Sequence, residues 1–414
     1  MREYSSDVVV IGGGPAGLAA ASSCLEAGAG RVLLVEKEAE LGGILPQCIH
    51  TGFGLLELKE DLTGPEFAEV LEERALNLGA QFLMNSYASR LWLDEGGVVV
   101  ECVSPRGIEV VHGKCLIYAA GCRERIPSEV GIVGDRPSGV FTAGTAQTLM
   151  DLYGLLPGER VVVVGSGDVG LIMSRRFAVE GAKVVAVVEM MKHPGGLTRN
   201  VVQCLEDYGI PLLLSHTVLE VRGKSRVKSV VVCELDENLT PIGGTEREIE
   251  CDTVIVATGL LPEVGLLEKA GAEVDRSTGG PVVNEFLETS LRGVFACGNV
   301  LVVNDLVDYA VEQGRLCARS AKSLLDGTLQ RPEAWRRSAA GEGVRFVVPQ
   351  LFSGAEDVTF YARVKKPKRN CRLSLREVPM DIKLPIVRPA EMLRISVKRD
   401  YLSKVERLTL EVVE

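Results

Sequence analysis

The feature that most constrains the fold of this chain is a glycine-rich loop that occurs twice in the same setting. Near the N-terminus, the run VVVIGGGPAGLAAA places Gly12, Gly14 and Gly17 between a predicted strand and a predicted helix, in the order G-x-G-x-x-G. These glycines allow a tight turn, close approach of the backbone to a pyrophosphate, and close packing of helix on strand. A second apolar run ends in Glu36, 19 residues past Gly17, where a carboxylate accepts hydrogen bonds from a ribose. The segment therefore predicts a βαβ unit that binds a dinucleotide.

The same arrangement returns in the segment RVVVVGSGDVGLIMSRRFAVEGAKVVAVVEM. Gly165, Gly167 and Gly170 take the corresponding places, and Glu189 again lies 19 residues past the last glycine. One such loop is a weak signal, because ordinary tight turns between a strand and a helix share its spacing. Two loops, each followed by an acid at the same distance, predict two nucleotide-binding domains.

The acid of the second unit also predicts which nicotinamide nucleotide is bound. A carboxylate at Glu189 accepts a hydrogen bond from a free 2′-hydroxyl and repels a 2′-phosphate. His193 and Arg199 follow closely in the sequence, and their basic side chains act against that preference. The sequence therefore favours NAD(H) over NADP(H).

Composition excludes several other classes of protein. The chain has 414 residues, enough for two or three domains, and its 46% hydrophobic and 25% charged residues are ordinary for a globular protein. A net charge of -10 argues against nucleic acid as the main partner. The charge is uneven, because residues 331–414 carry 18 Lys and Arg against 11 Asp and Glu. No apolar run is long enough to span a membrane, so we expect no transmembrane segment.

Cysteine usage indicates the compartment. The chain has 11 cysteines, and no two of them have C-x-x-C spacing. They lie in apolar segments, as Cys24, Cys102 and Cys115 do, which is typical of buried thiols in a reducing environment. We therefore predict a cytoplasmic protein without a metal site.

Three further segments fit the plan of a nucleotide-binding protein. CLIYAAGCRERIP and DTVIVATGLLPE are apolar strands that end in small-residue loops, at residues 119–121 and 257–259. GVFACGNVL is another strand, and a helical pattern follows it over residues 307–325. Asp305 and Asp308 lie at the start of that helix and are expected to cap it.

Taken together, these motifs resemble the flavoproteins with two dinucleotide-binding domains, the pyridine nucleotide-disulfide oxidoreductase superfamily, over residues 5–328. The resemblance implies an α/β fold with two Rossmann-like domains, of which the first binds FAD and the second NAD(P)H. It also implies that the NAD domain, residues 141–274, is inserted into an FAD domain made of residues 1–140 and 275–328. A small β-rich module, residues 329–414, follows.

The same resemblance assigns the binding residues by position. Asn299 departs from the family pattern, which has Asp after the late glycine, but an amide can still contact the ribityl or pyrophosphate groups. The implied FAD residues are Gly12, Gly14, Pro15, Ala16, Gly17, Glu36, Lys37, Gly42, Gly43, Gln47, Ala120, Gly121, Gly298 and Asn299. The implied NAD residues are Gly165, Gly167, Asp168, Val169, Gly170, Glu189 and Gly259.

Three segments, GGILPQCIHTGFG, AAGCRERIP and FACGNVLVVNDLVDYA, are similar to one branch of the superfamily. Its members are FAD/NAD-dependent oxidoreductase subunits found with glycerol-3-phosphate dehydrogenase, related to α-subunits of hydroxyproline, opine and amine dehydrogenase complexes. The resemblance implies an enzyme that exchanges electrons with NAD(H) through FAD, in a homo- or hetero-oligomer, while a partner dehydrogenase subunit oxidises the carbon substrate. Such proteins often carry a cysteine-rich [2Fe-2S] module, whereas the C-terminal region here has only Cys371.

The segment LGGILPQCIHTGFG leaves the role of Cys48 open. A flavin disulfide reductase needs two thiols near the flavin, and Leu45 stands near the place of the first. The C-terminal His-Glu pair of such reductases is also missing, because all four histidines precede residue 217. Cys48 is then either a packing residue over the flavin or a single redox thiol, and His50 either contacts the flavin or is structural. A thiol or disulfide reductase that uses Cys48, and a non-catalytic flavin-bearing assembly subunit, remain the alternative functions.

The C-terminal residues 329–414 alternate apolar and polar residues, with breaks at Pro and Gly. This pattern predicts short strands with turns near SGAED and KKPKRN. A solvated hairpin turn is expected to carry the basic cluster, with a docking surface for an acidic partner as the alternative. The cluster consists of Lys365, Lys366, Lys368, Arg369 and Arg372.

Overall fold

The computed structural model of the chain describes residues 2–414, which divide into two compact units. The first unit comprises Met1–Cys122 and Pro262–Glu414, and the second comprises Arg123–Leu261. The chain passes between them through β9 (Cys122–Glu124) and β19 (Leu260–Pro262), which pair as a two-stranded sheet. The domain limits given above from the sequence stay predictions.

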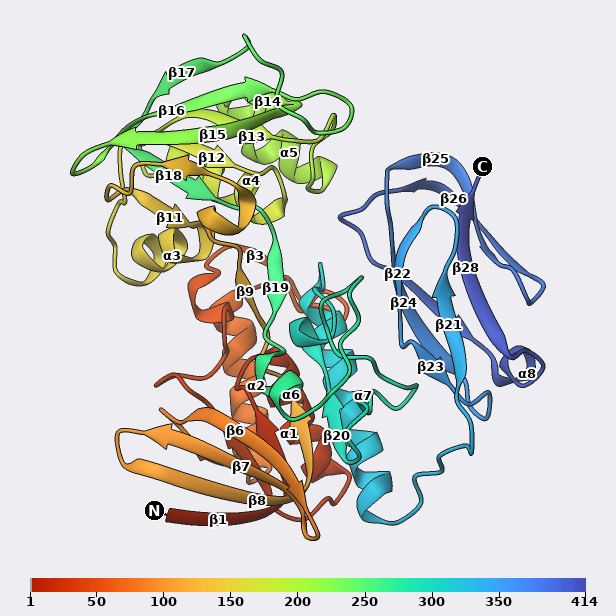
Figure 1. Cartoon of the computed structure of the whole chain (residues 1–414). Helices are drawn as coiled ribbons and strands as arrows, with labels where there is room; N and C mark the ends of the chain where they lie inside the picture. The colour runs from red at the N-terminus through yellow and green to blue at the C-terminus, as the bar shows by residue number, and fades with distance from the viewer. Residues whose placement is uncertain (1) are drawn as a thin grey trace. The chain divides into compact units, whose positions relative to one another are not determined.

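The first unit is built on a sheet of seven strands (Figure 1). Six of them follow the order β5–β2–β1–β8–β7–β6, and the seventh, β20, also pairs with β8. Pairing is parallel among β5, β2, β1, β8 and β20, whereas β6 and β7 add an antiparallel extension. Residues 8–10 of the central strand are fully buried, because a parallel strand is covered on both faces. The strands are β1 (Arg2–Ile11), β2 (Val32–Val35), β5 (Gln81–Leu83), β6 (Tyr87–Asp94), β7 (Gly97–Ser104), β8 (Gly107–Tyr118) and β20 (Val294–Ala296).

Helices α1 (Pro15–Glu26) and α7 (Val307–Leu325) of this unit pack so closely that their backbones are in contact. An added Cβ at Gly314 of α7 would lie 2.3 Å from the carbonyl oxygen of Ala16 in α1. Glycine is therefore required at this crossing, and the small residues along α1 let the two helices approach. The bounds of α7 confirm the helix predicted over residues 307–325. The unit also contains α2 (Gly64–Asn77), α6 (Gly265–Lys269), β3 (Thr51–Phe53) and β4 (Leu62–Thr63).

The second unit repeats this plan with a five-stranded parallel sheet in the order β11–β18–β12–β13–β14. A four-stranded sheet, β10–β15–β16–β17, accompanies it, and its antiparallel β15–β16–β17 part corresponds to the extension in the first unit. The strands are β10 (Val133–Gly134), β11 (Val140–Thr142), β12 (Arg160–Val164), β13 (Lys183–Glu189), β14 (Leu212–Leu214), β15 (His216–Gly223), β16 (Val227–Glu234), β17 (Arg247–Glu250) and β18 (Thr253–Val256). The helices are α3 (Ala143–Gln147), α4 (Asp168–Val179) and α5 (Thr198–Cys204).

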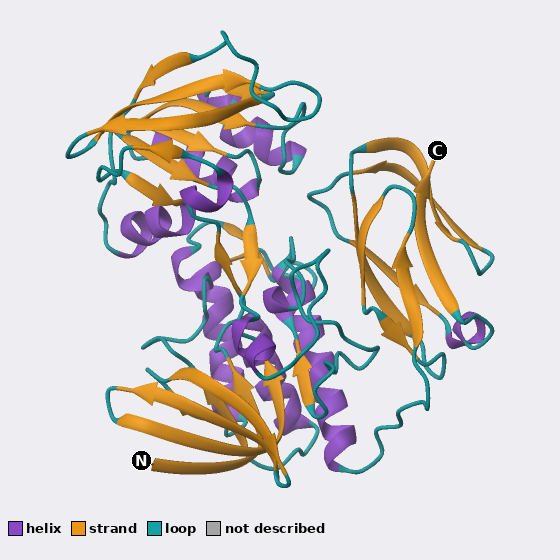
Figure 2. Ribbon diagram, in the orientation of Figure 1, coloured by secondary structure: helices purple, strands orange, loops and turns teal. Residues whose placement is uncertain are grey.

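The C-terminal part of the first unit, residues 336–413, is a β-sandwich, which Figure 2 shows as strands with one short helix. Its sheets, β23–β21–β28–β25–β26 and β22–β24–β27, enclose a core of their own that includes Phe352 and Phe360. The elements are β21 (Arg336–Ala340), β22 (Val344–Val348), β23 (Leu351–Phe352), β24 (Val358–Val364), β25 (Lys368–Leu375), β26 (Met380–Val387), β27 (Leu393–Val397), α8 (Arg399–Leu402) and β28 (Arg407–Val413). The β-rich C-terminal module, like the α/β class of the whole fold, is confirmed.

One detail of that module differs from the prediction. The strand β25 begins at Lys368 and pairs with Val387 of β26, so Lys368, Arg369 and Arg372 lie on a strand. The turn keeps only Lys365 and Lys366 of the basic cluster. The expected hairpin does not form, because the strands on either side of this turn, β24 and β25, belong to the two different sheets of the sandwich.

Nothing in residues 2–414 forms a helix both long enough and apolar enough to cross a membrane.

Candidate nucleotide-binding sites

The first loop requires glycine at two positions because the surrounding backbone leaves no room for a Cβ atom. Gly12 has φ +102°, and an added Cβ there would lie 2.4 Å from the carbonyl oxygen of Ala119. A Cβ at Gly17 would lie 1.9 Å from the carbonyl oxygen of Gly12, so only glycine lets α1 begin this close to β1. Pro15 stands at the start of α1, where the missing N–H costs nothing. This close approach is the geometry that lets a backbone loop contact a pyrophosphate.

Glu36, at the end of β2, is buried and holds the same loop. Its Oε2 accepts a hydrogen bond from the amide of Gly13 at 2.5 Å, and its Oε1 accepts one from the amide of Glu38 at 2.9 Å. Lys37 is exposed and pairs with Glu38 at 3.4 Å. Glu36 therefore fixes the position of the loop, and its carboxylate still has lone pairs for a ribose hydroxyl.

The segment around Gly42 and Gly43 lies against the first loop. The amide of Gly42 donates to the carbonyl of Gly13 at 2.8 Å, and a Cβ at Gly43 would lie 3.0 Å from the Cα of Gly14. Gln47 follows on the buried 3-10 turn η1 (Leu45–Gln47). The structure thus brings the predicted flavin-covering glycines to the predicted pyrophosphate loop.

Cys48 and His50 are held by their own segment. The Cys48 thiol donates to the carbonyl of Ile44 at 3.4 Å, and its carbonyl accepts from the amide of Gly64, where α2 begins. Cys48 is buried, with 8% of its surface exposed. His50 bonds through Nδ1 to the carbonyl of Thr51 at 2.9 Å, and its ring lies 5.2 Å from that of Phe53. These contacts tie both side chains to their own segment, and the roles given to Cys48 and His50 from the sequence stay predictions.

Gly298 and Asn299, after β20, complete the first site. Gly298 has φ +74°, and a Cβ there would lie 2.7 Å from the Cβ of Ala16 in α1. Its amide donates to Gln313 Oε1 at 2.9 Å. Asn299 Oδ1 accepts from the amide of Asn304 at 3.0 Å. The chain therefore returns to the first loop where the sequence predicts it.

The two acids at the start of α7, Asp305 before it and Asp308 in its first turn, do not cap the helix as predicted. The N-cap residue is Leu306, and no side chain caps it. Asp308 is buried and its Oδ1 accepts the amides of Leu56 and Glu57 at 3.1 and 2.8 Å. Asp305 instead pairs with Arg363 of the C-terminal module at 3.5 Å. Both acids bind segments far away in the sequence, which a local capping rule cannot anticipate.

The second loop repeats the geometry of the first. Gly165 has φ +101°, and its Cβ would lie 2.3 Å from the carbonyl oxygen of Ala257. A Cβ at Gly170 would lie 2.3 Å from the carbonyl oxygen of Gly165. Glu189 is buried, and its Oε2 accepts both the amide and the hydroxyl of Ser166, at 2.9 and 2.6 Å. The acid at the end of β13 therefore holds the second loop as Glu36 holds the first.

The segment after β13 is attached to the second loop. Asp168 Oδ1 accepts the amide of Leu197 at 2.8 Å and the side-chain amide of Asn200 at 2.7 Å. The amide of Gly195 donates to the hydroxyl of Ser166 at 2.9 Å. Val169 is left 42% exposed at the start of α4. These bonds hold the segment that carries His193 and Arg199 beside the second loop.

The small-residue loops end in equivalent glycines. Gly121 has φ +72° and Gly259 has φ +101°, and an added Cβ at either would meet nothing within 4 Å. Beside Gly259, the hydroxyl of Thr258 is buried without a hydrogen-bond partner. A buried hydroxyl without a partner costs about 1–3 kcal/mol, so it fits a position where a ligand supplies the bond.

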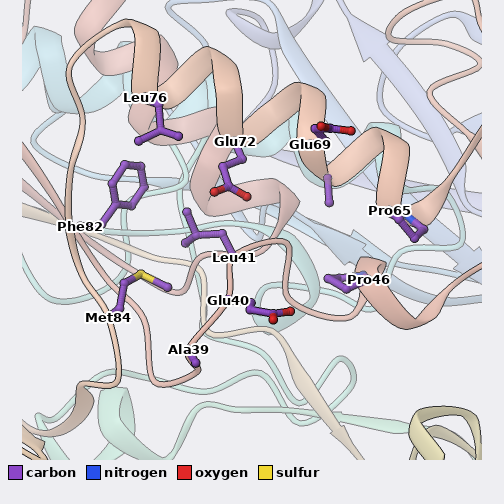
Figure 3. Close-up of a pocket in the computed structure, with 11 residues that line it drawn as sticks. Ala39, Glu40, Leu41, Pro46, Pro65, Glu69, Glu72, Leu76, Phe82 and Met84 are labelled. Atoms are coloured by element: carbon purple, nitrogen blue, oxygen red, sulfur yellow. The ribbon is translucent and has the colours of Figure 1, made fainter. Parts of the chain in front are cut away.

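A cavity of about 440 Å³ opens between α2 and the segment after β2 (Figure 3). Leu41, Phe82 and Met84 line it, and Glu69 and Glu72 extend from α2 toward it. The Leu41 side chain would also lie 2.5 Å from a Cβ at Gly13, so this cavity borders the first loop. Its carboxylates would repel a phosphate, so this cavity does not suit a pyrophosphate.

The 11 cysteines are reduced thiols in the structure, and ten of them are buried. Burial raises the pKa of Cys102 and of Cys115 to about 12, and it raises the pKa of Cys24 and Cys317 further above the usual range. Such thiols are protonated and unreactive at neutral pH. Residues 2–414 also hold no group of three or more His, Cys, Asp or Glu side chains able to bind a metal ion.

Three residues of these sites were not predicted. Gln313 binds the amide of Gly298 from the buried side of α7, Ser166 links Glu189 to its loop, and Cys122 accepts from Asn299 Nδ2 at 3.6 Å. Ser166 had a sequence signal, since it is the second residue of its G-x-G motif. Gln313 could have been found because it is a polar residue on the mostly apolar side of its helix.

The chain belongs to the pyridine nucleotide-disulphide oxidoreductase family, whose pattern matches residues 6–314. The family implies FAD and NAD(P)H as cofactors, and the protein is an FAD-dependent NAD(P)H oxidoreductase by class. This confirms the superfamily and the enzyme class predicted from the sequence.

Individual relatives each match about three quarters of the chain. A thioredoxin reductase from Treponema pallidum (strain Nichols) is 27% identical over 336 residues, which cover 79% of this chain and 99% of that protein. A solved thioredoxin reductase from T. acidophilum is 26% identical with a TM-score of 0.65, over 77% of this chain and 98% of that one. Sarcosine oxidase subunit alpha from Corynebacterium sp. (strain P-1) is 27% identical over 74% of this chain, but over only 32% of its own length.

Proposed function

We propose that this chain passes electrons between NAD(H), its own FAD and a protein partner or small acceptor, without a dithiol of its own. The observation that carries the proposal is the pair of complete nucleotide loops, each held by a buried acid. The chain has no C-x-x-C pair, and none of its cysteines forms a disulfide in the structure. Two nucleotide sites without a dithiol suit transfer between two redox cofactors better than reduction of a disulfide.

The residues of the first unit fit FAD. Positions 12, 14, 17, 43 and 298 are glycines, and a Cβ at Gly12, Gly17 or Gly298 would fill the space where the backbone segments meet. The first amides of α1 would favour the pyrophosphate of FAD, and Glu36 would accept from a ribose hydroxyl. Gly43, Gln47, Ala120, Gly121 and Asn299 complete the proposed FAD site. When bound, FAD supplies the hydride-transfer chemistry, and these residues bind and orient it.

The second unit fits NAD(H). With NAD(H) bound, the amides at the start of α4 would favour its pyrophosphate, and the buried carboxylate of Glu189 would accept from the adenosine ribose. The buried Thr258 hydroxyl would gain a partner. We propose a preference for NAD(H) over NADP(H), because the buried carboxylate of Glu189 repels a 2′-phosphate. His193 and Arg199, on the segment held by Ser166 and Asp168, set how strong this preference is.

We further propose that the acceptor is a subunit of a glycerol-3-phosphate or amino-acid dehydrogenase complex. The segments around Cys48, Cys122 and Asn299 resemble that branch, and sarcosine oxidase subunit alpha is a relative named as a subunit. Residues 329–414 hold one cysteine, Cys371, so this region cannot bind an iron–sulfur cluster by itself. Cysteine usage supports a cytoplasmic location, because none of the thiols is in a disulfide.

A thiol or disulfide reductase that uses Cys48 is the second candidate, favoured by the likeness to thioredoxin reductases. Against it, Cys48 is buried and its thiol donates to the carbonyl of Ile44. A reactive thiol is usually a partly exposed one, whereas only 8% of the surface of Cys48 is exposed.

Anaerobic stopped-flow reduction separates the candidates. We expect NADH to bleach the flavin absorbance of the purified protein, and Cys48→Ser to leave both the bleaching rate and the turnover with a dye acceptor unchanged. Loss of dye turnover in Cys48→Ser would favour the thiol mechanism. A flavin that NADH does not bleach would identify a non-catalytic assembly subunit and refute the proposal. Co-purification then identifies the dehydrogenase partner.

A further inference from the structure

The turn that joins β20 to α7, residues 299–306, lies between the first nucleotide loop and the C-terminal module. It begins at Asn299, directly after Gly298, and ends where α7 begins at Val307. We propose that Arg363 of β24 is a positioning residue for the flavin site and acts through this turn. The inference rests on the proposed binding of FAD by the first unit. It assigns the C-terminal module a part in cofactor binding.

Arg363 contacts the turn from the side of the module. Its Nη2 donates to the carbonyl of Val303 at 3.0 Å and lies 3.5 Å from Asp305 Oδ1. Asp305 Oδ2 accepts the amide of Met392, which also belongs to the module, at 3.1 Å. The Arg363 and Asp305 side chains are 17% and 13% exposed, so the pair is largely shielded from water. A shielded pair fixes geometry strongly, because loss of one partner leaves the other charge without compensation.

The same turn is connected to the nucleotide loop through Asn304 and Gln313. Asn304, next to Val303, donates its amide to Asn299 Oδ1 at 3.0 Å and accepts from Gln313 Nε2 at 3.1 Å. Gln313 Oε1 accepts the amide of Gly298, which lies against Ala16 at the start of α1. Hydrogen bonds and the peptide bond between Val303 and Asn304 therefore connect Arg363 to Gly298. Gly298 in turn packs against the end of the loop that would hold the pyrophosphate.

The module also makes a separate polar contact, which involves helix α7 and not the turn. Arg394 forms a two-pronged ion pair with Glu312, and Tyr361 donates to the same carboxylate at 3.0 Å. Burial alone would raise the pKa of Glu312, but the bonds from Arg394 and Tyr361 lower it overall. This contact stabilises docking of the module and so supplies a matched control.

The module stays in place when one polar contact is lost. Phe346, Val348, Tyr361 and Met392 of the module are buried in the same apolar cluster as residues of α1 and α7. A defect in Arg363 alone should therefore disturb the turn more than the docking. Effects on the flavin can then be separated from effects on folding.

The test compares Arg363→Met with Arg394→Met in the full-length protein. Bound FAD is removed, the affinity of the apoprotein for added FAD is measured by flavin fluorescence, and the visible spectrum of the bound flavin is recorded. We expect Arg363→Met to weaken FAD binding about tenfold and to shift the flavin bands, since a buried charge-assisted contact is lost. Arg394→Met should leave FAD affinity within about twofold and the spectrum unchanged.

Conservative variants keep the test decisive if Arg363→Met does not fold. Arg363→Lys can donate to one of its acceptors but cannot reproduce the guanidinium fork, so we expect an intermediate loss of FAD affinity. Wild-type affinity and spectrum in Arg363→Met, or in Arg363→Lys where only that variant folds, would overturn the inference. Equal losses in Arg394→Met would also overturn it, because they would indicate general docking. A wild-type protein that binds no FAD would instead refute the proposed function.

Discussion

The two nucleotide loops are alike in their glycines and their acids but differ in what covers the helix that follows. Ala16 and Val169 stand at the same place in the two motifs, one residue before the last glycine. Ala16 is only 5% exposed, because Gly298 and Gly314 both lie against it. Val169 is 42% exposed.

We infer from this difference that the first site retains its ligand and the second exchanges it. In the first unit Gly298, in the turn after β20, and helix α7 lie against the start of α1, so the loop is closed by chain from a distant part of the sequence. A cofactor that stays bound needs such closure, whereas a nucleotide substrate must enter and leave in each turnover. The comparison therefore supports FAD in the first unit and NAD(H) in the second.

The largest expected effect comes from filling the closest backbone approach. In Gly17→Val the new Cβ would lie 1.9 Å from the carbonyl oxygen of Gly12, which no rotamer relieves. We expect FAD affinity to fall at least about 100-fold, equivalent to about 3 kcal/mol. The ratio of flavin to protein absorbance after purification measures the loss.

The matched change in the second unit is Gly170→Val, whose Cβ would lie 2.3 Å from the carbonyl oxygen of Gly165. It should retain FAD and lose reduction of the flavin by NADH. Retained NADH reduction in Gly170→Val, or a loss of FAD in that variant, would show that the two loops do not serve separate nucleotides.

A milder exchange probes closure directly. Ala16→Val adds two methyl groups where Gly298 and Gly314 leave no room, and overpacking of this kind costs about 1–3 kcal/mol. We expect about tenfold weaker FAD binding, measured by titration of the apoprotein. The reverse change, Val169→Ala, removes an exposed side chain and should alter NADH affinity by less than about 0.5 kcal/mol. Equal effects of the two variants would contradict the contrast between a closed and an open site.

The acid of the second loop should set nucleotide affinity and choice. Glu189→Gln keeps an acceptor for Ser166 but removes the negative charge. We expect the Kd for NADH to rise about five- to tenfold, and the preference for NADH over NADPH to narrow by a similar factor. Steady-state kinetics with both nucleotides measure this, with Glu36→Gln as the control. The control should weaken FAD binding and leave the ratio between the two nucleotides unchanged.

The smallest effect concerns acid stability of the first unit. Arg106 holds the pKa of buried Glu109 down at about 2, from an ordinary value of 4.5. A lowered pKa stabilises the fold fully above pH 4.5, and that stabilisation is lost as the pH falls toward about 2. Urea unfolding followed by flavin release should show this pH dependence. The free energy of unfolding of Glu109→Gln should be smaller than that of the wild type at neutral pH and should fall less on acidification. A pH dependence parallel to that of the wild type would refute the role given to Glu109.

Much of the fold was predictable from the sequence because its determinants are local. The glycines, the apolar strands and the spacing to Glu36 and Glu189 act within single βαβ units. The helix at residues 307–325 followed from its apolar period, and the β-rich module from alternation. Long-range polar contacts were not predictable, since Asp305 and Asp308 bind residues 58 and about 250 positions away.

The candidate sites were predictable to the same extent. Positions fixed by backbone space, such as Gly17 and Gly298, could be named from the sequence. The partners that hold them, such as Gln313 and Arg363, could not, because their roles depend on which helix or sheet packs alongside. The role of Cys48 was left open by the sequence, and the structure adds its burial and its bond to Ile44.

The insertion of the second unit also has a consequence for the order in which the protein is made. Residues 123–261 are complete as a unit before the ribosome has synthesised β20 and α7. The second nucleotide loop can therefore reach its final structure while the first still lacks the strand and helix that close it, since domains fold as units during synthesis. Loading of the first site is then a late event of biosynthesis, and it waits for the last third of the chain.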